Sequence, residues 1–245
     1  MSKFKVDLNC DVGEGVDNEA FLIPNISSCN IACGGHAGDT ETMQTVVKLC
    51  KEYNVKAGAH PSFPDRENFG RKDMSMPHDD LVKSVKSQIE DLIVVLNENK
   101  VPLYHIKPHG ALYDMAAKNE TIAKAIIEVM QDYKEIHLYV PYNSVMERLA
   151  ITAGLSIIYE GFADRNYNED LRLVSRALPN ALIIDEEEMF EHVYRMVTQE
   201  KVKTASGVEV KIKAQTFCVH GDNPKAIELI AALKTNLTKS GIEIT

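Results

Sequence analysis

Short apolar segments alternate with helical patterns along the chain, and no other feature of the sequence restricts the fold as strongly. The apolar segments have the length and composition of buried strands, and residues with a period near 3.6 follow most of them. Strands that alternate with helices in this way form βαβ units around a parallel sheet. The expected strands comprise residues 4–9, 26–33, 55–60, 103–107, 136–140, 155–160 and 216–219, and 181–184 is a further candidate.

Several of the helical segments begin with recognisable start signals. Asp39 is placed to cap one helix, Asp185 and Glu188 resemble a capping box, and Asn223 with Pro224 begins the last helix. The expected helices comprise residues 40–53, 77–97, 121–133, 185–199 and 223–237. Residues 202–214 instead alternate with a period of two around a turn, which predicts a β-hairpin inserted before the last strand.

The length of 245 residues is close to the ~250 residues of a typical (β/α) barrel. We therefore predict an α/β fold with a parallel, TIM-like (β/α) barrel of seven or eight strands, formed by residues 1–245 as a single domain. In such a barrel the carboxyl ends of all strands open on one face, and catalytic groups gather there.

The charge and the cysteines restrict the partners and the compartment. A net charge of −9 argues against nucleic acid and anionic membranes as partners, because phosphates bind to basic patches. No apolar run is long enough for a membrane helix, and the first residues lack the apolar stretch of a signal peptide. The five cysteines form no CxxC pair, which favours reduced thiols. We expect a cytoplasmic protein.

Polar and ionisable residues gather where the expected strands end. Asp7, Asn9 and Asp11 alternate with apolar residues in the first strand, and side chains two positions apart share a face. The fourth strand repeats this arrangement with residues 105, 107 and 109. A single polar strand end is weak evidence for a functional site. Burying the charged groups of six strand ends without a function, however, would cost much free energy. The other polar strand ends contribute Asn30, His36, His60, Asp164, Arg165 and His220, and Glu14 follows the first strand.

Common nucleotide and hydrolase motifs are absent from the sequence. It contains no P-loop, no GxGxxG fingerprint, no GxSxG elbow and no HExxH motif. Gly34, Gly35 and Gly38 lie between a strand and a helix, where their backbone N–H groups are free to contact an anion.

Six sequence blocks, which occur in the order of the family, resemble the 5-oxoprolinase A-subunit family, also called the LamB/YcsF family, and the resemblance extends from about residue 5 to residue 238. The blocks are residues 7–14 (DLNCDVGE), 30–39 (NIACGGHAGD), 58–65 (GAHPSFPD) with 69–71 (FGR), 107–113 (KPHGALY), 160–165 (EGFADR) and 220–222 (HGD). The resemblance implies a barrel like those of glycoside hydrolases and deacetylases. It also implies ATP-dependent hydrolysis of 5-oxo-L-proline to L-glutamate, with ATP and Mg²⁺ as cofactors and with subunits B and C as partners.

The residues at the strand ends suit this chemistry. A lactam resists hydrolysis, and phosphorylation of its oxygen would create a better electrophile, after which a carboxylate or His activates water and cations hold the anionic groups. The catalytic candidates are Asp11, Glu14, His60, Lys107, His109, Asp164 and His220. The substrate-binding candidates are Asp7, Asn9, Asn30, His36 and Arg165. Because Lys107 is expected at the barrel mouth, we expect Lys107→Ala to abolish turnover and to leave the fold intact.

Two alternatives belong to other functional classes. A metal-dependent deacetylase or amidase that acts on a small amide or sugar would bind a divalent ion through Asp7 or Asp11 together with His60 and His109. A non-catalytic binding or scaffold subunit would tolerate changes at the strand ends. Activity without ATP and tight metal binding would favour the first alternative, and unchanged partner activity in the variants would favour the second.

Overall fold

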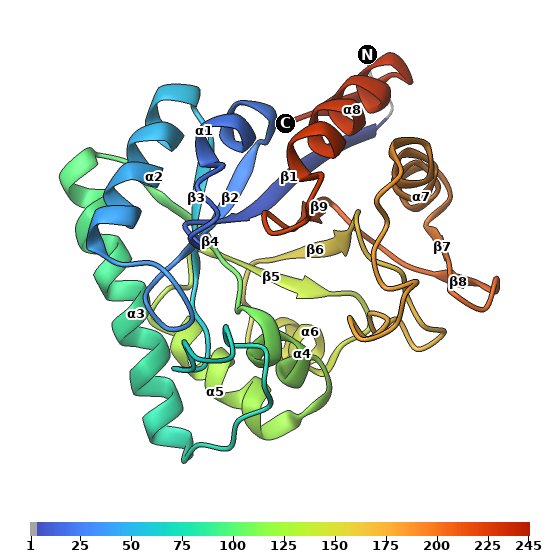
Figure 1. Ribbon diagram of the computed structural model, residues 1–245. Coiled ribbons are helices and arrows are strands. Elements are labelled where there is room, and N and C mark those ends of the chain that lie inside the picture. Colours follow the sequence, from blue (N-terminus) through green and yellow to red (C-terminus); the bar gives the residue numbers. More distant parts are fainter. Residues whose placement is uncertain (1–3) are drawn as a thin grey trace.

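The computed structural model describes residues 4–245, and within this range seven parallel strands close a barrel (Figure 1). The barrel strands are β1 (Phe4–Val12), β2 (Ser28–Ala32), β3 (Lys56–His60), β4 (Leu103–Ile106), β5 (His137–Pro141), β6 (Ile157–Phe162) and β9 (Thr216–Val219). Each strand pairs with the next along this series, and β9 pairs with β1 to close the barrel. The predicted parallel barrel is therefore confirmed, with seven strands.

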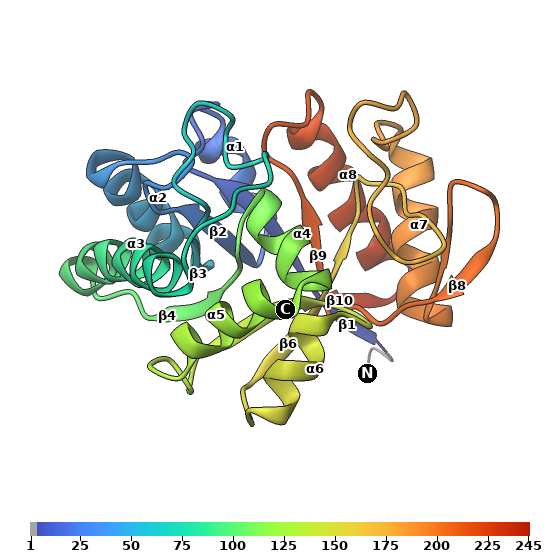
Figure 2. The same cartoon turned by 90° about the horizontal axis from the view of Figure 1, so that it is seen from below.

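Helices surround the barrel on its outer side (Figures 1 and 2). After the short α1 (Glu19–Leu22) and the 3₁₀ turn η1 (Ile23–Asn25), the helices are α2 (Thr40–Tyr53), α3 (His78–Asn99), α4 (Gly110–Lys118), α5 (Glu120–Met130), α6 (Val145–Thr152), α7 (Glu186–Gln199) and α8 (Ala226–Lys239). Helix α2 packs beside α3, α3 beside α5, and α7 beside α8. None of the helices in the described range has the length and apolar character needed to cross a membrane.

The helix start signals have mixed outcomes. The Asp39 side chain accepts the Thr42 N–H as a cap, and the Asp185 side chain accepts the N–H groups of residues 187 and 188. Helix α8 begins at Ala226 instead of 223, because Asn223 forms a turn in which its Oδ1 accepts the Lys225 N–H. Helices α4 and α6 were not predicted, since they are too short for the period of 3.6 to be distinctive.

The C-terminal half of the chain contains short strands in addition to the seven of the barrel. Strands β7 (Lys201–Lys203) and β8 (Glu209–Lys211) pair antiparallel in the stretch where the sequence predicts a hairpin. The candidate strand at 181–184 is wrong: its one ladder contact within residues 4–245 is an isolated bridge between Leu182 and Arg165. At the chain's end, β10 (Ile242–Ile244) pairs parallel with the beginning of β1.

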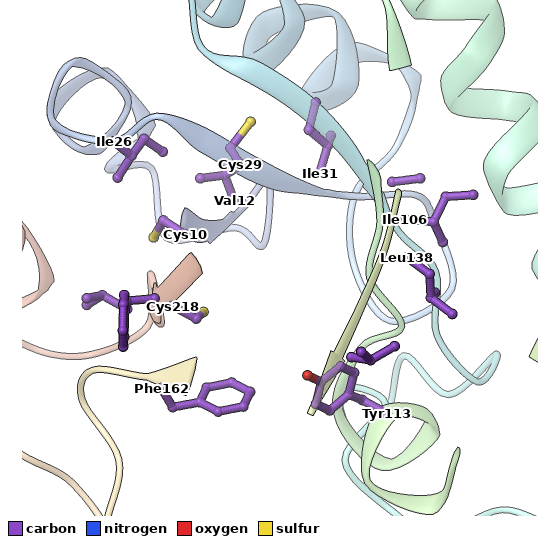
Figure 3. Close-up of a cluster of buried hydrophobic side chains, with 14 of the residues drawn as sticks. Cys10, Val12, Ile26, Cys29, Ile31, Ile106, Tyr113, Leu138, Phe162 and Cys218 are labelled. Atoms are coloured by element: carbon purple, nitrogen blue, oxygen red, sulfur yellow. The ribbon is translucent and has the colours of Figure 1, made fainter. Parts of the chain in front are cut away.

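The apolar core lies between the barrel and its helices, because outward-facing strand residues are apolar. Figure 3 shows part of it, including Ile31 of β2, Ile106 of β4 and Leu138 of β5, which are each at most 1% exposed. All five cysteines are buried and free, as the sequence predicts.

The inside of the barrel is polar instead. The inward residues of β1 are Asp7, Asn9 and Asp11, and the other strands add Ser28, Asn30, His60, His105, Tyr139, Glu160, Thr216 and Cys218, all of them buried. Gly58 of β3 also faces inward, since a Cβ atom there would lie 2.1 Å from Nε2 of His105. The glycine is therefore required for the His105 ring to fit inside the barrel.

Candidate active site

The deeper half of the barrel interior is a closed hydrogen-bonded network. Ser28 Oγ and Thr216 Oγ1 donate to Asp7 Oδ1 at 2.6 and 2.5 Å. One layer above, Asn30 Nδ2 donates to Asn9 Oδ1 at 2.7 Å, and Asn30 Oδ1 lies 2.6 Å from Nε2 of His105. Asp7, Asn9 and Asn30, which were predicted to bind substrate, therefore lie beneath the open end of the barrel.

A cavity of about 430 Å³ opens at the C-terminal ends of the strands. This volume is within the range of small-molecule sites. Its lining includes six predicted site residues, namely Asp11, His60, Lys107, His109, Arg165 and His220. The barrel closure thus brings together side chains from β1 and β3 and from the segments after β4, β6 and β9.

Lys107 forms the floor of the cavity together with two carboxylates. Its Nζ lies 3.0 Å from Asp11 Oδ1 and 2.9 Å from Glu160 Oε1, and its side chain is 3% exposed. Burial favours the neutral amine, but Asp11, Cys218 and Glu160 outweigh it and raise the pKa of Lys107 well above its usual value. Burial also favours the neutral form of Asp11, but Lys107 and His60 outweigh it and hold the pKa of Asp11 well below its usual range.

The burial of Lys107 changes one expectation. A group this deep, between two buried carboxylates, belongs to the packed interior and not to the rim of the mouth. Removing one partner of a buried ion pair leaves an uncompensated charge, which is strongly destabilising. The expectation that Lys107→Ala leaves the fold intact is therefore withdrawn.

Asp164 lies behind the cavity wall and holds His220. Its Oδ1 lies 2.9 Å from Nδ1 of His220, while its Oδ2 accepts the His220 backbone N–H and the Asn223 amide. Burial favours the neutral acid, but the contacts with His220 and Asn223 prevail and lower the pKa of Asp164. The imidazole is thereby oriented with its other nitrogen, Nε2, free for chemistry at the cavity.

Arginines make the rim of the cavity basic. Arg71 and Arg176 both pair with Asp222, at 2.5 and 3.4 Å. Arg165 donates to the backbone carbonyls of Val174 and Ala181, so it supports the loop over the cavity, and no carboxylate of residues 4–245 forms an ion pair with it. Three arginines thus line the cavity, and only two of them pair with an aspartate within residues 4–245, an arrangement that favours an anionic ligand.

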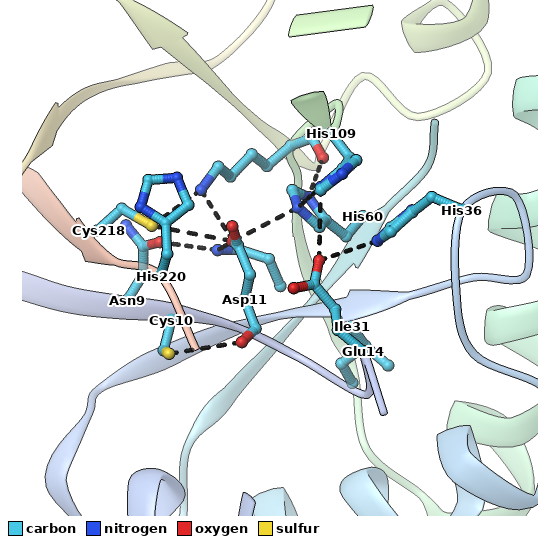
Figure 4. Close-up of polar contacts among 12 residues, drawn as sticks. Asn9, Cys10, Asp11, Glu14, Ile31, His36, His60, His109, Cys218 and His220 are labelled. Carbon is cyan, nitrogen blue, oxygen red and sulfur yellow. Dashed lines mark hydrogen bonds and ion pairs between the residues drawn. The ribbon is translucent and has the colours of Figure 1, made fainter. Parts of the chain in front are cut away.

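Glu14 and three histidines form a second cluster beside Asp11 (Figure 4). Glu14 Oε1 lies 2.9 Å from His36 Nε2 and 3.4 Å from His109 Nδ1, and His109 Nδ1 lies 2.9 Å from His60 Nε2. Burial and the charge of Asp11 raise the pKa of Glu14 well above its usual range. One ligand atom from each of Glu14, His36, His60 and His109 lies within 4.8 Å of the others, so this group has the composition and spacing of a metal site.

Several cavity residues were missed at the sequence level. Tyr113 and Glu160 lie within the recognised blocks, and Arg71 ends another, but none was assigned a site role. Tyr113 Oη and Glu160 Oε2 are buried beside each other, and neither forms a hydrogen bond of regular geometry within the described part of the chain. Burial and the charge of Glu160 raise the pKa of Tyr113 well above its usual value, so its hydroxyl keeps its proton.

A second cavity of about 450 Å³ adjoins the first. Tyr113, Asp114, Phe162, Leu173 and Ser175 line both cavities and form the wall between them. Glu160 lines the second cavity, whereas Lys107, its partner, lines the first. The Lys107–Glu160 pair therefore extends through this wall.

The chain and known proteins are similar over nearly their full length. A model of the LamB/YcsF family matches residues 6–245. Proteins named as the A subunit of 5-oxoprolinase from Staphylococcus saprophyticus and Pyrococcus abyssi are each 42% identical to this chain, over 98% of it and over 98% and 96% of their own lengths.

Solved structures agree with this similarity. The crystal structure of the lactam utilization protein from Thermus thermophilus has a TM-score of 0.92 and 36% identity, and the match covers 98% of this chain and 99% of that one. A family 4 carbohydrate esterase from Streptomyces lividans has a TM-score of 0.52 and 9% identity, over 100% of this chain and 93% of its own. At that identity, the second match shows the shared barrel fold alone.

Proposed function

Because this chain belongs to the LamB/YcsF family, we propose that it opens the lactam ring of 5-oxo-L-proline to give L-glutamate, in a reaction coupled to ATP hydrolysis. The names of the relatives describe one subunit of an enzyme, and we propose that this chain likewise acts with partner subunits B and C. The absence of a P-loop from the sequence supports assigning the ATP and Mg²⁺ to the assembled complex instead of to this chain alone.

One observation carries the proposal: a single cavity is lined by three arginines together with Asp11, Lys107 and His220. Arg71, Arg165 and Arg176 would hold the substrate carboxylate and the phosphate that activates the ring oxygen. Lys107 would stabilise negative charge that develops on this oxygen, as preorganised cations do at other acyl-transfer sites.

His220 is our candidate for the base that activates water. Its Nδ1 is held by Asp164, so its Nε2 is available to take a proton from water as the water attacks the ring carbonyl carbon. The C–N bond of the lactam then breaks, the nitrogen receives a proton, and the ring carbonyl carbon becomes the side-chain carboxyl carbon of glutamate. Because ATP supplies a phosphoryl group to the ring oxygen, breaking the C–N bond leaves γ-glutamyl phosphate, and a second water hydrolyses this acyl phosphate to glutamate and inorganic phosphate.

The test is an assay of glutamate release from 5-oxoproline with this chain, both partner subunits, ATP and Mg²⁺. We expect glutamate from the complete mixture and little or none when this chain, the partners or ATP is omitted. Robust turnover by the purified chain alone would contradict the division of roles. Hydrolysis of small amides without ATP would favour the metal-dependent amidase, and full activity in a complex with His220→Gln would favour a scaffold role.

A further inference from the structure

We infer that His60 Nε2, His109 Nδ1 and a carboxylate oxygen of Glu14 form a binding site for one divalent transition-metal ion, such as Zn²⁺. The inference rests on the hydrogen bonds of the two rings and does not depend on the proposed substrate. It shares His60 and His109 with the metal-dependent alternative from the sequence, but its carboxylate ligand is Glu14 instead of Asp7 or Asp11.

Backbone carbonyls determine the tautomer of each ring. His60 Nδ1 lies 2.7 Å from the carbonyl oxygen of Lys107, and His109 Nε2 lies 2.9 Å from that of Phe69. A carbonyl oxygen only accepts hydrogen bonds, so both of these nitrogens carry the proton. In the neutral rings His60 Nε2 and His109 Nδ1 are therefore lone-pair acceptors.

These two acceptors face each other at 2.9 Å, and neither supplies a proton to the other. Two carboxylate oxygens lie beside these nitrogens: Glu14 Oε1 at 3.4 Å from His109 Nδ1, and Asp11 Oδ1 at 3.4 Å from His60 Nε2. Acceptors that converge in this way repel one another unless a metal ion or a proton lies among them. Ligands at ~2.0–2.1 Å from a tetrahedral ion are about 3.3 Å apart, so the observed separations are close to those of a metal site.

The surroundings of the cluster resemble the outer shell of a metal site. Ligand histidines in proteins usually donate their second N–H to a carbonyl or carboxylate, as both rings do here. His36 provides the same support for Glu14: its Nδ1 has no partner within residues 4–245, so its Nε2 carries the proton and donates to the carboxylate. Since His60 and His109 line the cavity, a remaining coordination position would face it.

A second group of metal-ligand residues, Asp11, Cys218 and His220, is a poorer candidate. Lys107 Nζ lies 3.1 Å from Cys218 Sγ and 3.0 Å from Asp11 Oδ1, so an ammonium group already contacts two of its three ligand atoms. In the first group, by contrast, Glu14 forms ion pairs within the described residues only with His36 and His109, so no lysine or arginine pairs with it there. Two imidazoles and one carboxylate suit Zn²⁺ better than Mg²⁺, which prefers oxygen ligands.

The experiment is calorimetric titration of the chelator-treated full chain with Zn²⁺, and separately with Mg²⁺. We expect about one Zn²⁺ per chain and much weaker binding of Mg²⁺. His60→Gln and His109→Gln should each lower the Zn²⁺ affinity at least about 100-fold, and His36→Gln about 10–100-fold. Cys218→Ser and His192→Gln serve as controls and should bind Zn²⁺ like the unmodified chain.

A spectrum of the Co²⁺-loaded chain tests the ligands without any substitution, and so does not depend on how the variants fold. We expect the visible bands of Co²⁺ with nitrogen and oxygen ligands and no thiolate charge-transfer band. A thiolate band, loss of binding in Cys218→Ser, or unchanged binding in both His60→Gln and His109→Gln would overturn the assignment. Failure to bind Zn²⁺ stoichiometrically would also overturn it and would indicate a proton shared between the two rings.

Discussion

The Nζ atom of Lys107 lies 2.9 Å from Oε1 of Glu160, and this ion pair joins the floor of the first cavity to the second. Lys107 follows β4 and Glu160 lies in β6, so the pair depends on β5 pairing with both of these strands. Both side chains are almost fully buried, so bulk water cannot solvate one of the charges if the other is removed.

We predict that Lys107→Met lowers both stability and activity. The substitution leaves Asp11 and Glu160 without their shared cation, so the free energy of unfolding should fall by about 3–5 kcal/mol. Urea denaturation measures this change, and Lys124→Met, which breaks an exposed pair with Glu120, should change stability by less than about 1 kcal/mol. A Lys107→Met chain as stable as the unmodified one would show that Lys107 does not compensate these carboxylates.

We predict that His220→Gln lowers glutamate release by the complex about 10²–10⁴-fold, the usual contribution of a general base. Asp164→Asn should lower kcat as well, because the amide no longer selects the tautomer that Nδ1 of His220 now has. Rate measurements as a function of pH provide the check. A full rate with unchanged pH dependence in His220→Gln would exclude this residue as the base.

We predict that Arg176→Ala raises the KM for 5-oxoproline about 10–100-fold, since a hydrogen bond to a charged group contributes ~1.5–3 kcal/mol. The fold should remain intact, because Arg176 contacts only Asp222 among the ion pairs of the described residues. Arg148→Ala is the matched control, because that arginine pairs with Glu120 on the outer surface. Equal KM values for both variants would remove Arg176 from the binding site.

We predict that Tyr113→Phe has opposite effects on stability and activity. The hydroxyl is buried and forms no hydrogen bond of regular geometry in residues 4–245, so its removal should stabilise the free chain by ~1 kcal/mol. If the hydroxyl instead bonds to substrate in the working complex, turnover should fall. Thermal unfolding and glutamate release measure the two effects. A variant that is less stable and fully active would contradict both parts of this prediction.

We predict that acid weakens the fold through His192, which lies outside both cavities. Burial lowers the pKa of His192 from 6.5 to about 4, so its contribution to stability is complete above pH 6.5 and is lost as the pH falls towards 4. The unfolded chain takes up the proton first, and the loss amounts to roughly 3 kcal/mol. Unfolding experiments at pH 7 and pH 4 should show a smaller loss for His192→Gln; an identical loss would refute the prediction.

The sequence by itself determined the barrel and the place of its chemistry. Apolar strands that alternate with amphipathic helices can bury their apolar faces against one another in a parallel barrel. Polar residues at strand ends then gather at one face, as Lys107, His109 and His220 do. These inferences succeed because they depend on periodicity and on chain direction, which are local properties.

Only the tertiary structure decided the depth of each residue and its partners. Asp7, Asn9 and Asp11 share one face of β1, yet Asp11 alone reaches the cavity, because strand tilt and register set the height of each layer in the barrel. The facing nitrogens of His60 and His109 depend on carbonyls of residues 107 and 69, which no local pattern relates. The pairing of Lys107 with Glu160 likewise required the sheet, because Lys107 follows β4 and Glu160 lies in β6, and both strands pair with β5 between them.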